Sequence, residues 1–458
     1  MVDHIIILAA GYGRRMRSKK SKAAQVFAGK PMINWAYDLA KSCQPKFIHV
    51  VHNKDNQKEL VRLVPFPDIM WIKQEKICGT GDALRSAIEH IYEGQVLVLF
   101  VDMPLIETSQ LNALLHCDGD IKLLTAMSQN PKGYGRIIRD HNEVVQSIVE
   151  ELDLSPDQHA IQEVFTGILS APVALLKKLL AKLDNNNQQK EFLLTDIVKY
   201  AKEEKQAVNA VKLDHDYGIS GVNTIRQLVE LEKQYYLQRA YQFLDSGVRI
   251  ADPERFVCTG DIEIGHDTVI EPNVTLVGPC QIGHGCYVGQ NSRLDNVQLG
   301  DYASVHPYSF LKQTYLAANA SVGPFGYCRE GTVLADHAEV GAFVETKQAY
   351  IGHNSKAKHL SYLGDIDIGR HVNIGAGTIV CNYDGQKKHK TIIGNHVFVG
   401  SDSQLIAPVN LKDYTFVAAG TCVTEDVPEN TLAIGRSRQT NRKKPTHFSK
   451  SHTEIENL

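Results

Sequence analysis

Glycines and basic residues follow the first apolar run of this chain. Residues 5–10 are apolar and predict a β-strand, and Gly11, Gly13, Arg15 and Lys22 follow it. Glycine lets backbone N–H groups approach a phosphate closely, and an arginine and a lysine can neutralise its charge. A single G-x-G pair is weak evidence, but with two cations nearby it indicates a polyphosphate site.

Other side chains in the first half can complete such a site. Gln74 and the Gly-Thr-Gly segment at 79–81 can recognise a nucleotide base through amide and backbone groups. Asp102 follows an apolar run over 96–101, and one carboxylate together with substrate phosphates can hold Mg²⁺. Further sugar and metal candidates lie at 133–137, Glu150, 166–167 and 221–223.

The second half carries a histidine close to aromatic and acidic residues. His359 lies within the segment Lys-Ala-Lys-His-Leu-Ser-Tyr-Leu-Gly-Asp at 356–365. Acyl transfer from a thioester to an amine needs a base, because an ammonium group cannot attack, and imidazole titrates near neutral pH. A backbone N–H in the tight corner at 376–377 can donate to the oxyanion, and the basic loop that ends at Lys390 suits a phosphate. The alternative is that His359 is one solvated histidine among 19.

Alternating elements position the first group of residues. Strands are predicted over 5–10, 47–51 and 96–101, and helices over 32–42 and 80–92. This alternation is typical of a parallel, doubly wound α/β sheet, in which ligands bind beyond the carboxyl ends of the strands. Residues 226–246 then predict a linker helix.

An internal repeat of six residues positions the second group. Aliphatic residues recur at every sixth position from Ile264 to Leu294, and the register resumes at Leu299 after a slip of one residue. It continues in blocks as far as Val423, often with a glycine after the aliphatic residue. A period of six fits neither an α-helix nor an antiparallel strand. It fits a left-handed parallel β-helix, in which each six-residue unit forms one side of a triangular coil.

Composition is ordinary for a soluble globular protein. The chain has 458 residues, 22% of them charged, and a net charge of −3, so nothing favours a nucleic acid or a membrane surface as a partner. No stretch approaches about 18 consecutive apolar residues, and the first apolar run lacks the flanks of an export signal. The nine cysteines contain no C-x-x-C pair, so we expect reduced thiols in the cytoplasm and no zinc site.

The first half resembles the uridyltransferase half of a bifunctional bacterial family, the N-acetylglucosamine-1-phosphate uridyltransferases / glucosamine-1-phosphate N-acetyltransferases. The glycine-rich loop and the segments at 74–81, 102, 133–136, 150 and 223 occur in the family's order. The resemblance implies that Asp102 and Asn223 bind Mg²⁺, and that Arg15 and Lys22 stabilise charge at the α-phosphorus as catalytic residues. The residues that it implies for UTP and UDP-sugar binding are Leu8, Ala9, Ala10, Gly11, Lys22, Gln74, Gly79, Thr80, Gly135, Glu150 and Asn223.

Residues 250–436 resemble the acetyltransferase half of the same family. The resemblance is carried by the segment at 358–365, by Asn-Ile-Gly-Ala-Gly-Thr at 373–378 and by Cys-Asn-Tyr-Asp-Gly at 381–385. It implies that His359 is the general base, with Asn382 and Tyr383 at the reaction centre. The implied sugar-phosphate ligands are Arg329, Lys347, Tyr362, Asn373 and Lys388. The implied acetyl-CoA contacts are Ala376, Asn382, Tyr383, Ser401, Ala419 and Arg436.

The resemblance implies an α/β fold with a Rossmann-like nucleotidyltransferase domain over 1–225, the linker helix, a left-handed β-helix over 247–440 and a polar tail over 441–458. It implies a cytoplasmic homotrimer, joined through the β-helix, that acts on small sugar phosphates and nucleotides. The implied enzyme uses Mg²⁺, acetyl-CoA and UTP. Its product would be UDP-N-acetylglucosamine, a precursor of peptidoglycan and lipopolysaccharide.

Four positions depart from the family's pattern. Arg14 stands where Thr or Ser is usual, Ser21 replaces a Pro, Val101 replaces a Gly, and Phe165 replaces an Asn expected beside the acetamido group of the sugar. A valine crowds a place where substrate approaches the backbone, and the loss of the asparagine removes a hydrogen bond. Two alternatives therefore stay open: a monofunctional acetyltransferase with an impaired or altered nucleotidyltransferase domain, and a scaffold without enzymatic activity. We expect the tail from Lys443 onward to be disordered or to cover the acetyl-CoA site.

Overall fold

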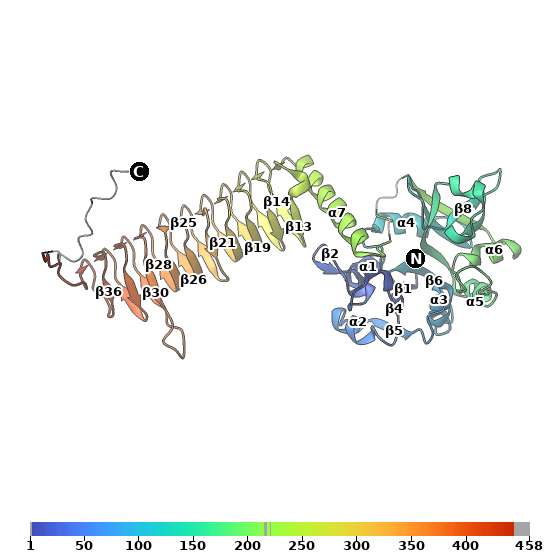
Figure 1. The fold of residues 1–458 in the computed structure, drawn as a ribbon, viewed down its shortest axis with the longest axis horizontal. Helices are drawn as coiled ribbons and strands as arrows, with labels where there is room; N and C mark the ends of the chain where they lie inside the picture. Colours follow the sequence, from blue (N-terminus) through green and yellow to red (C-terminus); the bar gives the residue numbers. More distant parts are fainter. Residues whose placement is uncertain (1, 215–217, 220, 444–458) are drawn as a thin grey trace, which may run out of the picture. The chain divides into compact units, whose positions relative to one another are not determined.

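The computed structural model describes residues 2–214, 218–219 and 221–443 (Figure 1). The chain divides into two compact units between Gln238 and Arg239. This division falls within helix α7, Ile225–Asp245. The domain boundaries predicted on either side of the linker helix stay a prediction, and the predicted tail beyond residue 443 lies outside the described residues.

One twisted sheet with helices on both faces forms the first unit. Its strand order is β11-β7-β10-β6-β1-β4-β5, and the hairpin β8–β9 attaches to β10. The strands are β1 (His4–Leu8), β4 (Phe47–His52), β5 (Ile69–Lys73), β6 (Gln95–Phe100), β7 (Ile121–Met127), β8 (Arg136–Arg139), β9 (Val145–Val149), β10 (Glu163–Pro172) and β11 (Val208–Leu213). The helices are α1 (Met32–Ser42), α2 (Gln57–Leu63), α3 (Thr80–Ile88), α4 (Thr108–His116), α5 (Val173–Leu180) and α6 (Asp196–Glu203), and a small ladder joins β2 (Val26–Phe27) to β3 (Lys30–Pro31).

Successive residues of β1 pack into different cores, because side chains alternate across a strand. Ile5 and Ile7 pack with residues of α1 and α4, whereas Ile6 and Leu8 pack with residues of α3 and α5. The sheet therefore lies between two helical layers. This arrangement explains why the strand is apolar at every position from Ile5 to Leu8, without polar alternation.

The prediction of a parallel sheet is wrong at β10 and in the antiparallel hairpin β8–β9. β1 pairs in parallel with β4 and β6, but β10 runs antiparallel to both β6 and β7. A parallel neighbour needs a crossover connection, usually a helix. The chain instead passes from β7 through the hairpin β8–β9 and short 3-10 turns into β10, so it returns in the opposite direction.

Two predicted elements end earlier than expected. The strand predicted over 5–10 ends at Leu8, because the side chains of Asn53 and Asn56 donate to the carbonyl oxygens of Ala10 (2.6 Å) and Ala9 (2.9 Å). The helix predicted over 80–92 ends at Ile88, where tight turns lead to Gly94 at φ +106°. The helix predicted over 32–42 has the observed bounds of α1.

The second unit is a parallel β-helix whose short strands form three ladders. The first ladder contains β12 (Arg249–Ile250), β15 (Val269–Ile270), β18 (Tyr287–Val288), β20 (Ser304–Val305), β22 (Ser321–Val322), β25 (Glu339–Ala342), β27 (Lys356–His359), β29 (Asn373–Ile374), β32 (Phe398–Val399), β35 (Phe416–Val417) and β37 (Leu432–Ala433). The second contains β13 (Val257–Thr259), β16 (Thr275–Val277), β19 (Arg293–Leu299), β21 (Phe310–Leu316), β23 (Tyr327–Cys328), β26 (Glu345–Ile351), β28 (Tyr362–Ile368), β30 (Ile379–Cys381), β33 (Gln404–Ile406) and β36 (Cys422–Val423). The third contains β14 (Ile262–Ile264), β17 (Cys280–Ile282), β24 (Thr332–Leu334), β31 (Thr391–Ile393) and β34 (Val409–Leu411), and the longer strands β19, β21, β26 and β28 run on into it.

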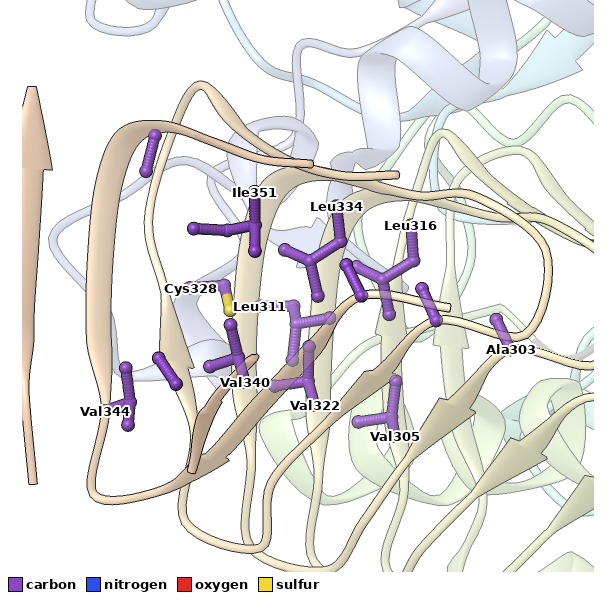
Figure 2. Close-up of a cluster of buried hydrophobic side chains, with 14 of the residues drawn as sticks. Ala303, Val305, Leu311, Leu316, Val322, Cys328, Leu334, Val340, Val344 and Ile351 are labelled. Atoms are coloured by element: carbon purple, nitrogen blue, oxygen red, sulfur yellow. The ribbon is translucent and has the colours of Figure 1, made fainter. Parts of the chain in front are cut away.

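The aliphatic residues of the six-residue repeat form the core of this unit. Figure 2 shows Leu316, Leu334 and Ile351 stacked along one side of the coil interior, with Val322 and Val340 facing them. Each of these five side chains is at most 1% exposed. Stacking buries every coil against its neighbours, so the periodic positions of the sequence become one continuous apolar column.

The slip of one residue in the repeat is a real change in coil length. Ile264 pairs with Ile282 three repeats later, but Ile282 pairs with Leu299, which is one residue closer. A much longer interval joins Ile374 to Val399, because the loop after β30 is inserted into that coil. This loop projects away from the coils in Figure 1.

Candidate functional site

A pocket of ≈ 540 Å³ opens at the carboxyl ends of β1 and β6. Eleven residues proposed for the nucleotide or the metal line it: Leu8, Ala9, Ala10, Gly11, Arg15, Lys22, Gln74, Gly79, Thr80, Asp102 and Asn223. In an open α/β sheet, ligands bind in a crevice beyond the carboxyl ends of the strands. The strands therefore bring together segments that lie far apart in the sequence.

The loop after β1 is held against the segment that begins at Lys22. Gly13 adopts φ 61°, and a Cβ at this position would lie 2.8 Å from the Cβ of Lys22. The following 3-10 turn, Arg14–Met16, buries Met16 and leaves Arg15 at the pocket. Only glycine at position 13 allows the turn and the lysine to lie this close.

Four polar side chains meet at one end of the pocket. The ammonium group of Lys22 contacts Asp102 Oδ2 and lies 2.8 Å from Asn223 Oδ1. Arg15 donates to the same oxygen of Asn223 at 2.9 Å. The side chains of Lys22 and Asp102 are 15% and 12% exposed, so this ion pair is partly shielded from water.

The donor atoms of this cluster fit a hard divalent cation. The carboxylate oxygen of Asp102 and the amide oxygen of Asn223 converge on one point, which the positive charge of Lys22 occupies. Oxygen donors of this kind suit Mg²⁺, which keeps open positions for water and phosphate oxygens. Among the described residues no group of three or more His, Cys, Asp or Glu side chains could hold a metal, so a cation here would need oxygens from the substrate.

Hydrogen bonds hold the main chain at Asp102 and at Asn223. The N–H of Val222 donates to the carbonyl of Asp102 at 2.9 Å, which joins the last loop of the unit to the end of β6. Gln227 accepts from the N–H of Asn223 at 2.9 Å. Ser21, which stands where the related family has Pro, has a buried hydroxyl without a hydrogen-bond partner in the described chain.

The opposite end of the pocket is formed by the turn before α3. Gln74 donates to Asp82 at 2.8 Å, and Gly79 adopts φ +117°. The turn packs against the segment that carries Glu191, which also lines the pocket. The sequence pattern did not single out Glu191, which lies in the connection between α5 and α6.

Two proposed sugar-binding residues do not line this pocket. Glu150 accepts a hydrogen bond of 3.0 Å from Thr195, and burial raises the pKa of its carboxyl group. Gly135 accepts from the N–H of Phe165 at 2.9 Å. Arg136, in the same predicted segment, is 2% exposed and is bound to Glu151 at 2.8 Å, which makes it part of the fold.

The departures from the family's pattern have clear positions. Val101 is 5% exposed and contributes both to the pocket wall and to one of the cores. Phe165 is 6% exposed and packs in the other core. Arg14 lies over the ring of Tyr12, 5.4 Å from its centroid, and also lines the pocket.

In the β-helix, basic side chains gather on the second ladder. Arg329 is bound to Glu345 at 3.0 Å, and Lys347 is bound to Glu330 at 3.3 Å. Lys388, from the inserted loop, lies beside Lys347. This contact and the repulsion between the two ammonium groups lower the pKa of Lys388. An anion placed here would relieve the repulsion.

Asn382 and Tyr362 are joined at the base of the inserted loop. The amide of Asn382 donates to Asp365 at 2.5 Å and to the hydroxyl of Tyr362 at 3.5 Å. A Cβ at Gly364 would press on that hydroxyl, so a larger residue there would require the side chain of Tyr362 to shift. Tyr383 is 61% exposed, and its hydroxyl donates to Gly385 within the loop.

His359 lies at the end of β27 and is exposed. Its carbonyl accepts from Ser361 at 2.9 Å, but no hydrogen bond to its imidazole is present among the described residues. Asn373 pairs with Lys356 in the same ladder and has no described side-chain bond to the basic group. The predicted residues therefore lie on neighbouring coils, but in the described part of the chain no side-chain hydrogen bond or ion pair joins His359 or Asn373 to the others.

The corner that was expected to donate one backbone N–H to an oxyanion has one N–H without a partner among the described residues. The N–H of Gly377 donates to Leu360 at 3.0 Å, within the coil stack. The N–H of Ala376 has no partner in the described part of the chain. The expectation for the corner therefore reduces to Ala376.

Ala376, Ser401 and Ala419 lie on successive coils of one edge. Asp402 donates to the carbonyl of Ala376 at 2.7 Å, and Gly420 donates to the carbonyl of Ser401 at 2.8 Å. Arg436 reaches back to the carbonyl of Ala419. These four residues, proposed to contact acetyl-CoA, thus form a row in which Ala376 is half-buried and the other three are exposed.

Two family models match the chain. Residues 5–192 match the MobA-like NTP transferase domain, and residues 261–296 match the bacterial transferase hexapeptide model of six repeats. The chain is a transferase. The predicted fold class is confirmed, since a Rossmann-like nucleotidyltransferase domain precedes the left-handed parallel β-helix of this transferase. Within the described residues no helix is long and apolar enough to cross a membrane.

Solved structures of sugar nucleotidyltransferases are similar to part of the transferase. A UDP-glucose pyrophosphorylase in complex with UDP-glucose is 16% identical with a TM-score of 0.42, and the match covers 52% of this chain and 100% of the other. A structure from Bacillus anthracis in complex with sucrose, assigned as a glucose-1-phosphate thymidylyltransferase, is 18% identical with a TM-score of 0.43. That match covers 50% of this chain and 94% of the other.

Proposed function

We propose that this transferase makes UDP-N-acetylglucosamine in two steps. The β-helix unit transfers acetyl from acetyl-CoA to glucosamine-1-phosphate, and the first unit then transfers UMP from UTP to N-acetylglucosamine-1-phosphate and releases pyrophosphate. The observation that carries the proposal is the convergence of Lys22, Arg15, Asp102 and Asn223 at one end of the pocket. Two cations beside two metal-type oxygens suit a triphosphate with its metal.

In the uridylyl transfer, Arg15 and Lys22 bind the phosphate oxygens and stabilise the charge that develops as pyrophosphate leaves. Asp102 and Asn223 would hold Mg²⁺, which when bound neutralises phosphate charge and orients the groups for in-line attack. An oxygen of the sugar phosphate forms the new bond to the α-phosphorus, and the bond from that phosphorus to the pyrophosphate oxygen breaks. Little covalent chemistry is required of the protein beyond this positioning.

The nucleotide would occupy the pocket, and the sugar would bind beside it. We propose that Gln74, Gly79 and Thr80 bind the base and that the backbone from Leu8 to Gly11 follows the phosphates. Gly135 and Glu150 would bind the sugar. Neither of these two residues lines the pocket.

In the acetyl transfer, His359 would accept a proton from the amine of the sugar as the amine attacks the thioester carbon. The N–H of Ala376 would donate to the oxyanion, after which the carbon–sulfur bond breaks and His359 would pass its proton to the sulfur, so that CoA leaves as its thiol. Asn382 and Tyr383 would line the reaction centre. The sugar phosphate would bind the basic residues and their polar neighbours, namely Arg329, Lys347, Tyr362, Asn373 and Lys388.

The row of Ala376, Ser401, Ala419 and Arg436 supports an extended acetyl-CoA along one edge of the β-helix. His359 and Tyr383 are exposed, which supports a site completed by a neighbouring copy of the chain. We therefore propose a homotrimer joined through the β-helix units. Its location in the cytoplasm stays a prediction.

A second function has its own support. Val101 occupies the pocket wall beside Asp102, and Phe165 packs an apolar ring into the core where the related family has an amide. Both features favour a monofunctional acetyltransferase whose first unit accepts a different sugar phosphate or reacts slowly.

Pyrophosphate release from UTP and N-acetylglucosamine-1-phosphate tests the proposal. We expect turnover by the wild type and its loss in Asp102→Ala. A silent wild type together with an active Val101→Gly, Phe165→Asn double variant would instead support the second function. If thermal melting shows that both proteins are folded and neither the wild type nor the double variant releases pyrophosphate, neither protein is a uridyltransferase.

A further inference from the structure

Lys22 occupies the place that the proposed function gives to a divalent cation. Its ammonium group contacts the carboxylate of Asp102 and lies 2.8 Å from the amide oxygen of Asn223. Arg15 donates to that same amide oxygen at 2.9 Å. The two oxygens proposed for the metal are therefore already bound by the protein's own cations.

An ammonium group and a divalent cation cannot share these two oxygens. Both need the lone pairs of Asp102 Oδ2 and Asn223 Oδ1, and like charges at such short range repel strongly in a partly shielded site. Lys22 must leave before a metal can bind there. Its side chain is 15% exposed, so it borders the open pocket and has a path toward a bound phosphate.

The charge of the cluster makes this exchange depend on the nucleotide. Lys22 and Arg15 carry two positive charges against the single negative charge of Asp102, so the cluster is cationic before any metal arrives. A metal alone would make it more so. A triphosphate offers Lys22 and Arg15 new anionic partners, which frees the oxygens of Asp102 and Asn223.

We propose that Lys22 is an internal stand-in for the metal, and that it makes metal and triphosphate binding cooperative. In the empty site Lys22 holds Asp102 and Asn223 in position. When the triphosphate binds, Lys22 moves to its phosphate oxygens and the metal takes the vacated place. By linkage, each of the two ligands then raises the affinity of the site for the other. This inference rests on the proposed metal role of Asp102 and Asn223.

Metal binding without nucleotide gives the direct test. Binding of Mn²⁺ alone to the full-length, metal-free protein is measured by electron paramagnetic resonance for the wild type, Lys22→Met and Lys22→Gln. Loss of the competing ammonium group should strengthen Mn²⁺ binding roughly tenfold, a value typical of coupling between sites. Lys20→Met is the matched control, since Lys20 is exposed, lies in the same segment and has no described bond to Asp102.

A second measurement separates competition from damage to the fold. Binding of metal-free UTP in the presence of a chelator should weaken in Lys22→Met and Lys22→Gln, because the phosphate loses a cation. Opposite changes for Mn²⁺ and UTP cannot come from partial unfolding, which weakens both.

Two results would overturn the inference. If the Lys22 variants bind Mn²⁺ no better than the wild type while the wild type still releases pyrophosphate, Lys22 is only a phosphate ligand and the proposed function stands. If Lys20→Met strengthens Mn²⁺ binding as much as the Lys22 variants do, general charge explains the effect and no direct competition exists.

Discussion

Lys22 and Asp102 form a partly buried ion pair, although one lies in the loop after β1 and the other at the end of β6. β1 and β6 are parallel neighbours in the sheet, with Leu8 opposite Phe100, so their carboxyl ends deliver both residues to one edge. The pocket thus results from strand order. Changes in the loops around it should alter binding without altering the sheet.

The first glycines of the loop after β1 should respond differently to a methyl group. Gly13→Ala should destabilise the first unit by about 1–2 kcal/mol, because its φ of 61° is left-handed and its Cβ would press on Lys22. Gly11→Ala should leave the melting temperature unchanged, since nothing lies within 4 Å of its Cβ. Because Gly11 lines the pocket, that variant should still weaken UTP binding, which calorimetry can measure. Equal melting temperatures for Gly13→Ala and the wild type would contradict this account of the loop.

Lys388→Gln should raise the KM for glucosamine-1-phosphate about tenfold or more, because a hydrogen bond to a charged group contributes about 1.5–3 kcal/mol. It should not lower the melting temperature. Lys388 lies beside Lys347, and this contact and the repulsion between the two ammonium groups lower the pKa of Lys388, so the substitution removes an unfavourable charge pair. The exposed neighbour Lys387 offers the control variant Lys387→Gln. A loss of kcat with an unchanged KM would argue against a phosphate contact.

Glu150→Gln should melt at a higher temperature than the wild type at neutral pH. Burial raises the pKa of Glu150 above its ordinary value of 4.5, so the folded protein favours the protonated form more than the unfolded chain does. The ionised carboxylate therefore destabilises the fold at pH values above the raised pKa, and the penalty disappears as the pH falls below 4.5. Gln keeps an oxygen for the hydrogen bond from Thr195. If Glu150 binds the sugar, Glu150→Gln should also lose uridylyl transfer. Full uridylyl transfer by this variant would show that Glu150 is not part of the sugar-binding site.

His49 should make the first unit sensitive to acid. It is 3% exposed, its Nδ1 has no partner in the described chain, and burial lowers its pKa from 6.5 to about 4. Since protonation is disfavoured in the folded state, stability is intact above pH 6.5 and is lost as the pH falls toward 4. The shift corresponds to about 3 kcal/mol. Urea unfolding of His49→Gln should lack this loss, whereas His116→Gln, at an exposed site, should behave as the wild type does.

The β-helix could be predicted closely from the sequence. Each side of a coil has a fixed number of residues, so the inward-facing positions recur at a regular interval along the sequence. Leu316, Leu334 and Ile351 are such positions and lie in the core. Even the shortened coil at Leu299 is visible as a slip in that period. Ile264 is the exception, since it is only partly buried near the start of the coil stack.

The first unit was less predictable because its pairings are not local. The antiparallel direction of β10 depends on which strands it pairs with, and the hydrophobic pattern of the sequence does not indicate those partners. Glu191 reaches the pocket through a turn packed on Gly79, far away in sequence. The bond from Gly377 to Leu360 likewise depends on the stacking of coils, so the corner could be predicted but not which of its N–H groups is free.

The most direct test supplies the full-length protein with glucosamine-1-phosphate, acetyl-CoA, UTP and Mg²⁺ and follows the sugar by mass spectrometry. The account predicts UDP-N-acetylglucosamine from the wild type and accumulation of N-acetylglucosamine-1-phosphate with Asp102→Ala. His359→Ala should leave glucosamine-1-phosphate unreacted, and added N-acetylglucosamine-1-phosphate should restore its product. Formation of UDP-N-acetylglucosamine by Asp102→Ala, or acetylation by His359→Ala at the wild-type rate, would contradict the assignment of one reaction to each unit.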